Sequence, residues 1–169
     1  MSLETISSRS SRRGFTLIEL VIVVALISIV AVYAVPSFGR LIESNRVSST
    51  ANGIMGMLRY TRSEAVKVGR TVNVRPVDGA SWSSGLLVWL DLDGDNTFDA
   101  NEELRRFADM NTGLTIAGSA TSIGFRGNGF LTPASEANFQ LSVASTNTTT
   151  SFVCTGLAGR IRTAGSACN

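Results

Sequence analysis

The chain has 169 residues and a formal net charge of +2, from 15 basic and 13 acidic side chains, and it contains no histidine. Without histidine, a Ser-His-Asp triad, a Cys-His dyad and a histidine-bound zinc site are excluded. The nearly even charge balance does not by itself indicate a nucleic-acid-binding protein, and the length suits one domain with an appendage.

The first feature along the chain is an apolar run of 21 residues, from Phe15 to Val35, that contains a single acid, Glu19. As a helix this run would span roughly 30 Å, the thickness of a bilayer core. Arginines precede the run at positions 9, 12 and 13, and the next basic residue is Arg40. The positive-inside rule therefore predicts a cytoplasmic N-terminus, with the residues after the run across the membrane.

Glu19 is the unusual residue of this run, because an ionised carboxylate in hydrocarbon costs several kcal/mol and is usually paired. Cleavage after Gly14 would leave a new α-amino group on Phe15, four residues before Glu19. That cation could neutralise Glu19 within one chain or between neighbouring helices. An ordinary signal anchor, in which Glu19 has no such role, is the simpler alternative.

The junction GFTLIE, residues 14–19, resembles the cleavage site of type IV pilins and of the pseudopilins of type II secretion. The resemblance implies that a prepilin peptidase cleaves between Gly14 and Phe15, that Phe15 is N-methylated, and that Glu19 guides insertion into a helical filament. Pro36 corresponds to the proline that kinks the long N-terminal helix of this family, since a proline inside a helix removes a hydrogen bond.

A periodic apolar pattern follows Pro36 and predicts that the helix continues to about Val68. Gly69 would end it. A free-standing coiled coil is the weaker alternative, because the repeat is short. The apolar positions recur at alternating spacings of four and three residues, which is one stripe of an amphipathic helix: Val47, Ala51, Ile54, Leu58, Thr61, Ala65 and Val68.

From Thr71 onward the sequence predicts short strands joined by turns, with no second long helix. The predicted strands cover residues 72–74, 85–90, 104–107, 114–116, 123–125, 139–143, 151–154 and 159–163. STNTTTS, residues 145–151, is low in complexity and predicts a polar loop or hairpin tip. The expected fold class is α+β, with a long N-terminal helix, transmembrane in its first half, packed against a C-terminal antiparallel β-sheet head.

Two stretches of the predicted β-rich head resemble one particular group within this family. Residues 82–107, WSSGLLVWLDLDGDNTFDANEELRRF, and residues 122–133, SIGFRGNGFLTP, are similar to segments of GspH/FimT minor pilins and pseudopilins. The resemblance implies a cleaved cytoplasmic leader at residues 1–14 and a transmembrane, filament-core helix at 15–38. The amphipathic half of the helix would follow at 39–69 and a β-rich periplasmic or extracellular head at 70–169.

The acidic turn after the second predicted strand has the spacing of a calcium loop. Position 6 of that loop is Asn96 instead of glycine, and the flanks predict strands, so the turn is not an EF-hand. A solvated β-turn, in which Asp and Asn serve turn geometry, is the alternative. No other cofactor is expected. The candidate calcium ligands, at loop positions 1, 3, 5, 9 and 12, are Asp91, Asp93, Asp95, Asp99 and Glu102.

The two cysteines of the chain, Cys154 and Cys168, lie near the C-terminus. Export of the head would place both in an oxidising space, which predicts a disulfide. The bridge would close a loop of 13 intervening residues and contribute about 3 kcal/mol in the loop-entropy model. Two free thiols are the alternative.

Inside that loop lies Gly159-Arg160-Ile161-Arg162, and residues 154–168 contain no acid. In an extended segment Arg160 and Arg162 point to the same side, where each could contact a phosphate. The G-R-x-R pattern resembles the DNA-contacting motif of FimT-type pilins in natural transformation, and similar strands are expected in FimU-like pilins that prime assembly. A solvated strand face is the alternative. Two contacts give weak, salt-sensitive binding, so Arg126 or many copies along a filament would be needed.

Together these features predict a minor type IV pilin, and not an enzyme, because no nucleophile–base pair or phosphate loop is readable. The expected partners are major and minor pilins, the prepilin peptidase, an inner-membrane assembly platform and double-stranded DNA. We expect a single pass through the inner membrane with a periplasmic head, then extraction into a pilus on the cell surface. Two alternatives stay open: a purely structural, FimU-like priming pilin, and a GspH-type pseudopilin of type II secretion.

Overall fold

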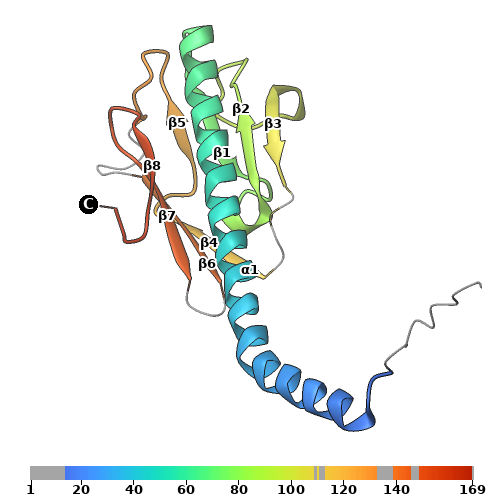
Figure 1. Ribbon diagram of the computed structural model, residues 1–169. Coiled ribbons are helices and arrows are strands. Elements are labelled where there is room, and N and C mark those ends of the chain that lie inside the picture. Colours follow the sequence, from blue (N-terminus) through green and yellow to red (C-terminus); the bar gives the residue numbers. More distant parts are fainter. Residues whose placement is uncertain (1–13, 109, 111–112, 133–138, 146–148, 169) are drawn as a thin grey trace, which may run out of the picture. The chain divides into compact units, whose positions relative to one another are not determined.

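The computed structural model describes residues 14–108, 110, 113–132, 139–145 and 149–168. The chain forms two compact units, Met1–Gly39 and Arg40–Asn169. One long helix, α1 (Leu17–Val68), begins in the first unit and ends in the second, and eight strands belong to the second unit (Figure 1). The long helix and the antiparallel sheets confirm the α+β fold predicted from the sequence.

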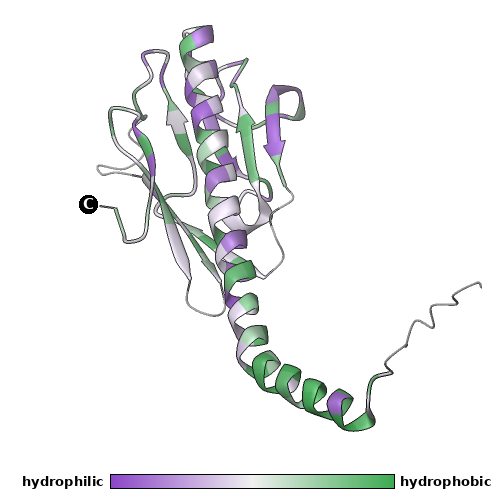
Figure 2. Cartoon of the chain, in the orientation of Figure 1, coloured by the Kyte–Doolittle hydropathy of each residue, from purple (hydrophilic) through white to green (hydrophobic). Residues whose placement is uncertain are grey.

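The first part of α1 exposes its apolar side chains in every direction. The large apolar side chains between Leu17 and Val35 are 43% to 81% exposed, and Figure 2 shows apolar residues over nearly all of this stretch. With a mean hydropathy of 2.8 over its most apolar window, α1 is long and apolar enough to cross a membrane by length and composition. A helix that is apolar all round is stable where lipid or other protein chains cover it.

Helix α1 continues through Pro36, which lies in its interior. Proline has no amide N–H, so the hydrogen bond that this residue would donate to the carbonyl of Val32 is absent. The helical assignment nevertheless extends without a gap to Val68, as the periodic pattern after Pro36 predicted.

The second part of α1 is amphipathic and buries one face. Six of the seven residues in the predicted stripe are buried, from Val47 to Ala65, but Val68 is 37% exposed. Thr50 and Met57, which the stripe did not include, are also buried and widen the covered face. The helix ends before Gly69, whose φ of +67° is the left-handed conformation that closes many helices.

The strands form two antiparallel sheets. The first sheet has the order β3-β2-β1-β5 and the second has the order β4-β6-β7-β8. Each predicted strand is present, and its bounds differ from the prediction by at most two residues. The polar loop predicted at 145–151 includes residues 146–148, which lie outside the described residues. The bounds are β1 Val72–Pro76, β2 Leu86–Trp89, β3 Glu103–Phe107, β4 Leu114–Gly118, β5 Ile123–Phe125, β6 Phe139–Ser145, β7 Thr150–Thr155 and β8 Ile161–Ala164.

The core lies between the second part of α1 and both sheets. Ile54 and Leu58 of α1 belong to one buried cluster with side chains of both sheets, among them Val74 of β1 and Val143 of β6. Full burial of an aliphatic side chain contributes about 1.5–3 kcal/mol, so this cluster fixes the helix on the sheets. Trp82, in a short 3₁₀ helix (Trp82–Ser84), donates from its indole nitrogen to the carbonyl of Ala120 at 2.8 Å.

Candidate functional site

The N-terminal junction is an exposed helix start. Phe15 is 83% exposed, and a side chain at Gly14 would meet nothing within 4 Å. The amide of Glu19 donates to the hydroxyl of Thr16 at 3.2 Å, so Thr16 caps α1 and Glu19 lies in its first turn. An acid there is favoured by the helix dipole. The spacing Thr16-x-x-Glu19 is a known signature of a helix N-terminus. It could have predicted this cap from the sequence, but the sequence analysis did not use it. The processing and assembly roles of these residues and of Pro36 stay predictions.

The acidic turn brings together three of its five candidate ligands. Carboxylate oxygens of Asp91, Asp93 and Asp95 all lie within 4.8 Å of one another. The turn is held by its own amides, since Asp91 accepts from Gly94 at 2.6 Å and from Asn96 at 3.1 Å. Asn96 has a φ of +59°, the left-handed conformation that Asn tolerates.

Glu102 faces backbone amides of the same turn. Its side chain is buried, and its two carboxylate oxygens accept from the amides of Leu92 at 2.6 Å and Asp99 at 3.1 Å. Glu102 therefore ties the two ends of the turn together. Within the described part of the chain, neither it nor Asp99 belongs to the carboxylate cluster. A calcium site there stays a prediction and would rest on three carboxylates.

Like charges shift the acidity of this cluster. The amide of Asp95 donates to Asp93 and is the largest influence on the pKa of Asp93, which it lowers. Partial desolvation and the charges of Asp95, Glu102 and Asp91 outweigh it, so the pKa of Asp93 is raised. The pKa of Asp95 is lowered, because the hydroxyl and amide of Thr97 both donate to it. Repulsion of this kind favours a bound cation, although solvated acidic turns also show it.

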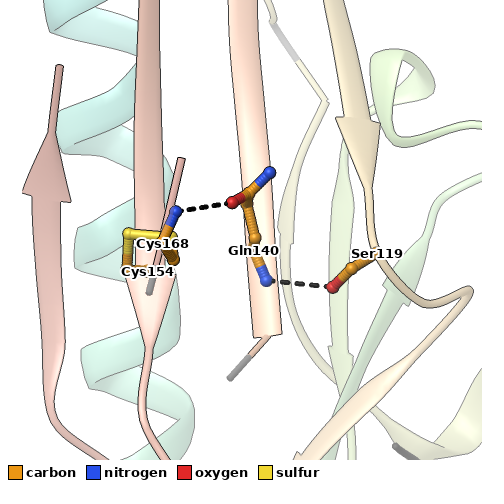
Figure 3. The surroundings of a disulfide bond; sticks show 4 residues. All are labelled: Ser119, Gln140, Cys154 and Cys168. Carbon is orange, nitrogen blue, oxygen red and sulfur yellow. Dashed lines mark hydrogen bonds between the residues drawn. A yellow bond between two sulfur atoms is a disulfide. The ribbon is translucent and has the colours of Figure 1, made fainter. Parts of the chain in front are cut away.

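The predicted disulfide joins Cys154 to Cys168, with a Cα–Cα distance of 5.7 Å. Cys154 lies in β7 opposite Gln140 of β6. The amide of Cys168 donates to the side-chain oxygen of Gln140 at 2.8 Å, and the amide of Gln140 donates to Ser119 at 3.0 Å (Figure 3). The bridge therefore fixes the segment after β8 on the second sheet.

The turn between β7 and β8 depends on Gly159, which has a φ of +73°. Its amide donates to the carbonyl of Gly156 at 2.8 Å and closes the turn. A Cβ atom at this position would overlap the carbonyl oxygen of Gly129 and lie 2.7 Å from Nε of Arg62. The structure thus gives Gly159 a packing role, in addition to the DNA-contacting role that the sequence pattern suggested.

Arg62 of α1 holds two turns of the head against the helix. Its Nε donates to the carbonyl of Gly129 at 2.9 Å, and Nη2 donates more weakly to that of Ala158 at 3.5 Å. The two turns also contact each other, because the amide of Leu131 donates to the carbonyl of Leu157 at 2.9 Å. Sequence reasoning missed Arg62, since nothing local distinguishes it from the other arginines of α1.

The structure places Arg126 in a different pocket from Arg160, although the sequence grouped both with Arg162 as DNA contacts. Arg160 is exposed, precedes β8 and lines a groove of about 630 Å³. Arg162 is exposed on β8, opposite Cys154. Arg126 lines a different pocket, of about 650 Å³, together with Arg70. The groove beside Arg160 is lined by Arg59, Arg62, Ser63, Val66, Ala158, Gly159, Arg160 and Ile161.

Two family descriptions match the chain. Residues 50–159 match the family Type II transport protein GspH, and residues 9–35 match the prokaryotic N-terminal methylation motif. The chain is 32% identical over 111 residues to the type IV major fimbrial protein FimA of Dichelobacter nodosus, covering 64% of this chain and 63% of that one. It is 36% identical over 61 residues to the type II secretion system protein H of Xanthomonas campestris pv. campestris, covering 36% of each. The matches thus span less than two thirds of either relative.

Solved structures share the fold. The minor pilin FimU of Pseudomonas aeruginosa has a TM-score of 0.60 and 24% identity, over 72% of this chain and 90% of that one. The minor pseudopilin EpsH of the Vibrio cholerae type 2 secretion system has a TM-score of 0.51 and 18% identity, over 70% and 96%. Because the GspH match covers more than half of the chain, the chain belongs to the GspH family of type IV pilins and pseudopilins, which are structural proteins and not enzymes.

Proposed function

We propose that this chain is a minor type IV pilin that contributes to the capture of double-stranded DNA through Arg160 and Arg162. The observation that carries the proposal is the placement of two exposed arginines on a hairpin fixed by the Cys154–Cys168 bridge. Residues 154–168 contain no acid, so no neighbour in this segment cancels their charge. Arginine forms short, charge-assisted hydrogen bonds to phosphate.

The route to the filament begins at the N-terminal junction. A prepilin peptidase would cut between Gly14 and Phe15, and Phe15 would be N-methylated, in keeping with the methylation motif at residues 9–35. The N-terminus would stay in the cytoplasm and the head would enter the periplasm. An inner-membrane assembly platform would then move the subunit into the pilus, where Glu19 pairs with an N-terminal amine and the apolar helix packs among other pilins.

The strength of DNA binding follows from the small number of contacts. Two phosphate contacts per subunit release few counterions, so binding is weak and falls as salt rises. Several copies along a filament would raise the effective affinity without new contacts. Contacts to phosphates carry no sequence information, so uptake of unrelated DNA sequences is expected.

A mobility-shift titration with short duplex DNA tests the proposal. The full chain in non-ionic detergent should retard the duplex at low salt, and Arg160→Gln combined with Arg162→Gln should abolish the shift. Arg105→Gln with Arg106→Gln makes the same change in net charge on β3, another exposed strand, where Arg106 is paired with Glu103, and it serves as the control for net charge alone. If the variant with Arg160→Gln and Arg162→Gln shifts the duplex as the wild type does, the proposed DNA-binding role is wrong.

A purely structural role is the second candidate function, in a pilus or in a type II secretion pseudopilus. The fold that the chain shares with FimU, a type IV minor pilin, and with EpsH, a type 2 secretion pseudopilin, is compatible with either machine. The packing role of Gly159 also favours it, because part of the G-R-x-R pattern then serves the fold alone. A priming subunit would need its apolar helix and its pilin neighbours but no exposed arginines.

Calcium binding at the acidic turn is a separate proposal, favoured by the approach of Asp91, Asp93 and Asp95 to within 4.8 Å. A bound calcium ion would relieve their mutual repulsion and take carboxylate oxygens as ligands. Calorimetry of the full chain should then detect calcium binding that Asp93→Asn weakens. If calorimetry detects no heat of binding at millimolar calcium, this proposal is wrong.

A further inference from the structure

We propose that the groove between α1 and the β7–β8 turn seats a phosphodiester backbone, with Arg59, Arg62 and Arg160 as its phosphate contacts. This inference rests on the proposed function and extends the binding surface from the G-R-x-R hairpin onto the helix. The groove has a volume of about 630 Å³, within the range of ligand sites in proteins. The sequence analysis assigned only Arg160 of these three residues to DNA.

Helical spacing places the groove residues of α1 on one face. Arg59, Arg62, Ser63 and Val66 follow one another at intervals of three, one and three residues, which is one stripe of a helix. This stripe lies next to the buried face of α1, and its residues line the groove together with the turn that carries Arg160. Val66 is 53% exposed, so the apolar floor of the groove is open to a ligand.

Arg62 is held in position before any ligand arrives. Its bonds to the carbonyls of Gly129 and Ala158 use two donors of the five that a guanidinium carries. The remaining N–H groups can therefore contact an anion with little further loss of side-chain freedom. Arg59, on the helix, and Arg160, on the turn, line the same groove as this fixed group.

The positive charge of the groove is not cancelled locally. Among the described residues, none of the three arginines forms a salt bridge, and Glu64 of the same helix pairs with Lys67 at 2.8 Å. Asp91 of the acidic turn lines the separate pocket that contains Arg126, and no acidic residue is among those that line the groove in the described part of the chain. The groove thus has a positive field that favours an anionic ligand.

The layout favours a polymer of regularly spaced charges. Arg162 lies two residues after Arg160, on β8, so a charged polymer seated in the groove could extend to a further cation there. The apolar side chains of Val66 and Ile161 would contact sugar carbons. Among the residues that the structure describes, no aromatic side chain lines the groove, so the proposed site does not include base stacking and its binding is independent of sequence.

Fluorescence anisotropy of labelled duplex DNA, with the full chain in non-ionic detergent, tests the groove. Arg59→Gln should weaken binding roughly threefold, and the slope of log K against log salt should fall by about 0.9, as expected for one lost phosphate contact. Val66→Glu, which places a carboxylate in the groove, should weaken it further. Arg46→Gln, an equal charge change at an exposed position of α1 outside the groove, should leave affinity within twofold.

The outcomes separate this inference from the proposed function. If Arg160→Gln with Arg162→Gln abolishes binding while Arg59→Gln and Val66→Glu behave like Arg46→Gln, DNA is held by the hairpin alone and the groove assignment is wrong. If the wild-type chain binds no duplex, both proposals fail. Binding of labelled polyglutamate without binding of DNA would overturn both and would point to an acidic protein partner.

Discussion

Arg62 and Gly159 form a contact that joins three segments distant in sequence. The guanidinium of Arg62 reaches the carbonyls of Gly129 and Ala158, and this is possible because Gly159 has no side chain to fill the space between them. The guanidinium thus joins both turns to the C-terminal part of α1. Because Arg160 follows Gly159 directly, the same contact also positions Arg160, which is proposed to bind DNA.

Replacing Gly159 by alanine should destabilise the head by about 1–3 kcal/mol or more, because the new Cβ meets Gly129 and Arg62 and the left-handed backbone becomes strained. Denaturant unfolding of the full chain in detergent, followed by tryptophan fluorescence, measures the change.

Gly165→Ala is the matched control for this variant, since a Cβ there meets nothing within 4 Å and Gly165 has no positive φ. Equal midpoints for the two variants would show that the close approach at Gly159 does not matter for stability.

At the scale of elements, the β7–β8 hairpin is an edge structure that needs external support. Strand β8 pairs only with β7 in the described sheet, so its outer edge is unpaired and prone to fray. The disulfide fixes the segment after β8, and the bond from Cys168 to Gln140 carries that support to β6. The arginines of the hairpin are therefore positioned by the covalent bridge as well as by the sheet.

Replacing both cysteines by serine should lower the free energy of unfolding by about 3 kcal/mol, the loop-entropy value for a bridge that closes a loop of this size. It should also weaken DNA binding, because β8 would sample more conformations. Chemical unfolding and anisotropy measure the two effects.

Reductant added to the wild-type chain should reproduce the serine variant, and it should leave the variant itself unchanged. A wild-type protein whose stability does not respond to complete reduction would contradict this role of the bridge.

The helix and the strands could be predicted from the sequence, but the pairing of the strands into sheets could not. The apolar run and the three–four periodicity defined α1 to within two residues of its start, and short apolar segments between turn residues defined all eight strands. Local patterns do not specify which strands pair, so the division into two sheets could not be read. Spacing alone predicted Glu102 as a metal ligand, which stays a prediction; spacing did not show that both of its oxygens accept from backbone amides.

The residues of the groove show the same limit at the candidate site, because local sequence patterns do not show which distant segments lie side by side. Arg160 and Arg162 could be found because they lie in one short motif without acids. Arg59 and Arg62 share a groove with Arg160 only because the turn that carries Arg160 approaches α1, which depends on the tertiary fold. Arg126 was grouped with them on charge, but it lines a separate pocket.

At the scale of the whole molecule, the chain combines two different parts. The first part of α1 exposes apolar side chains that lipid or other protein chains must bury, whereas the head has a hydrophobic core of its own. The first unit exposes apolar side chains along the whole first part of α1, whereas the second has a buried cluster drawn from the helix and both sheets. Lipid and then neighbouring pilins would cover the first unit in turn. On the proposed route, the leader before Phe15 would be removed before this transfer.

Mass spectrometry of the protein from sheared filaments or membranes should find a mature chain that starts at N-methylated Phe15. Gly14→Val should leave the leader attached, because a bulky residue before the cut would not fit a peptidase that accepts glycine. A mature chain beginning elsewhere, or normal processing of the variant, would contradict the assigned junction.

The measurement that tests the central claim most directly is a deletion scored in parallel for twitching, transformation and protein secretion, with complementation by wild-type and variant chains. A DNA-capturing minor pilin predicts loss of transformation with secretion intact. The variant carrying Arg160→Gln and Arg162→Gln should restore any lost twitching but not transformation. Loss of secretion alone, or full rescue of transformation by that variant, would contradict the account.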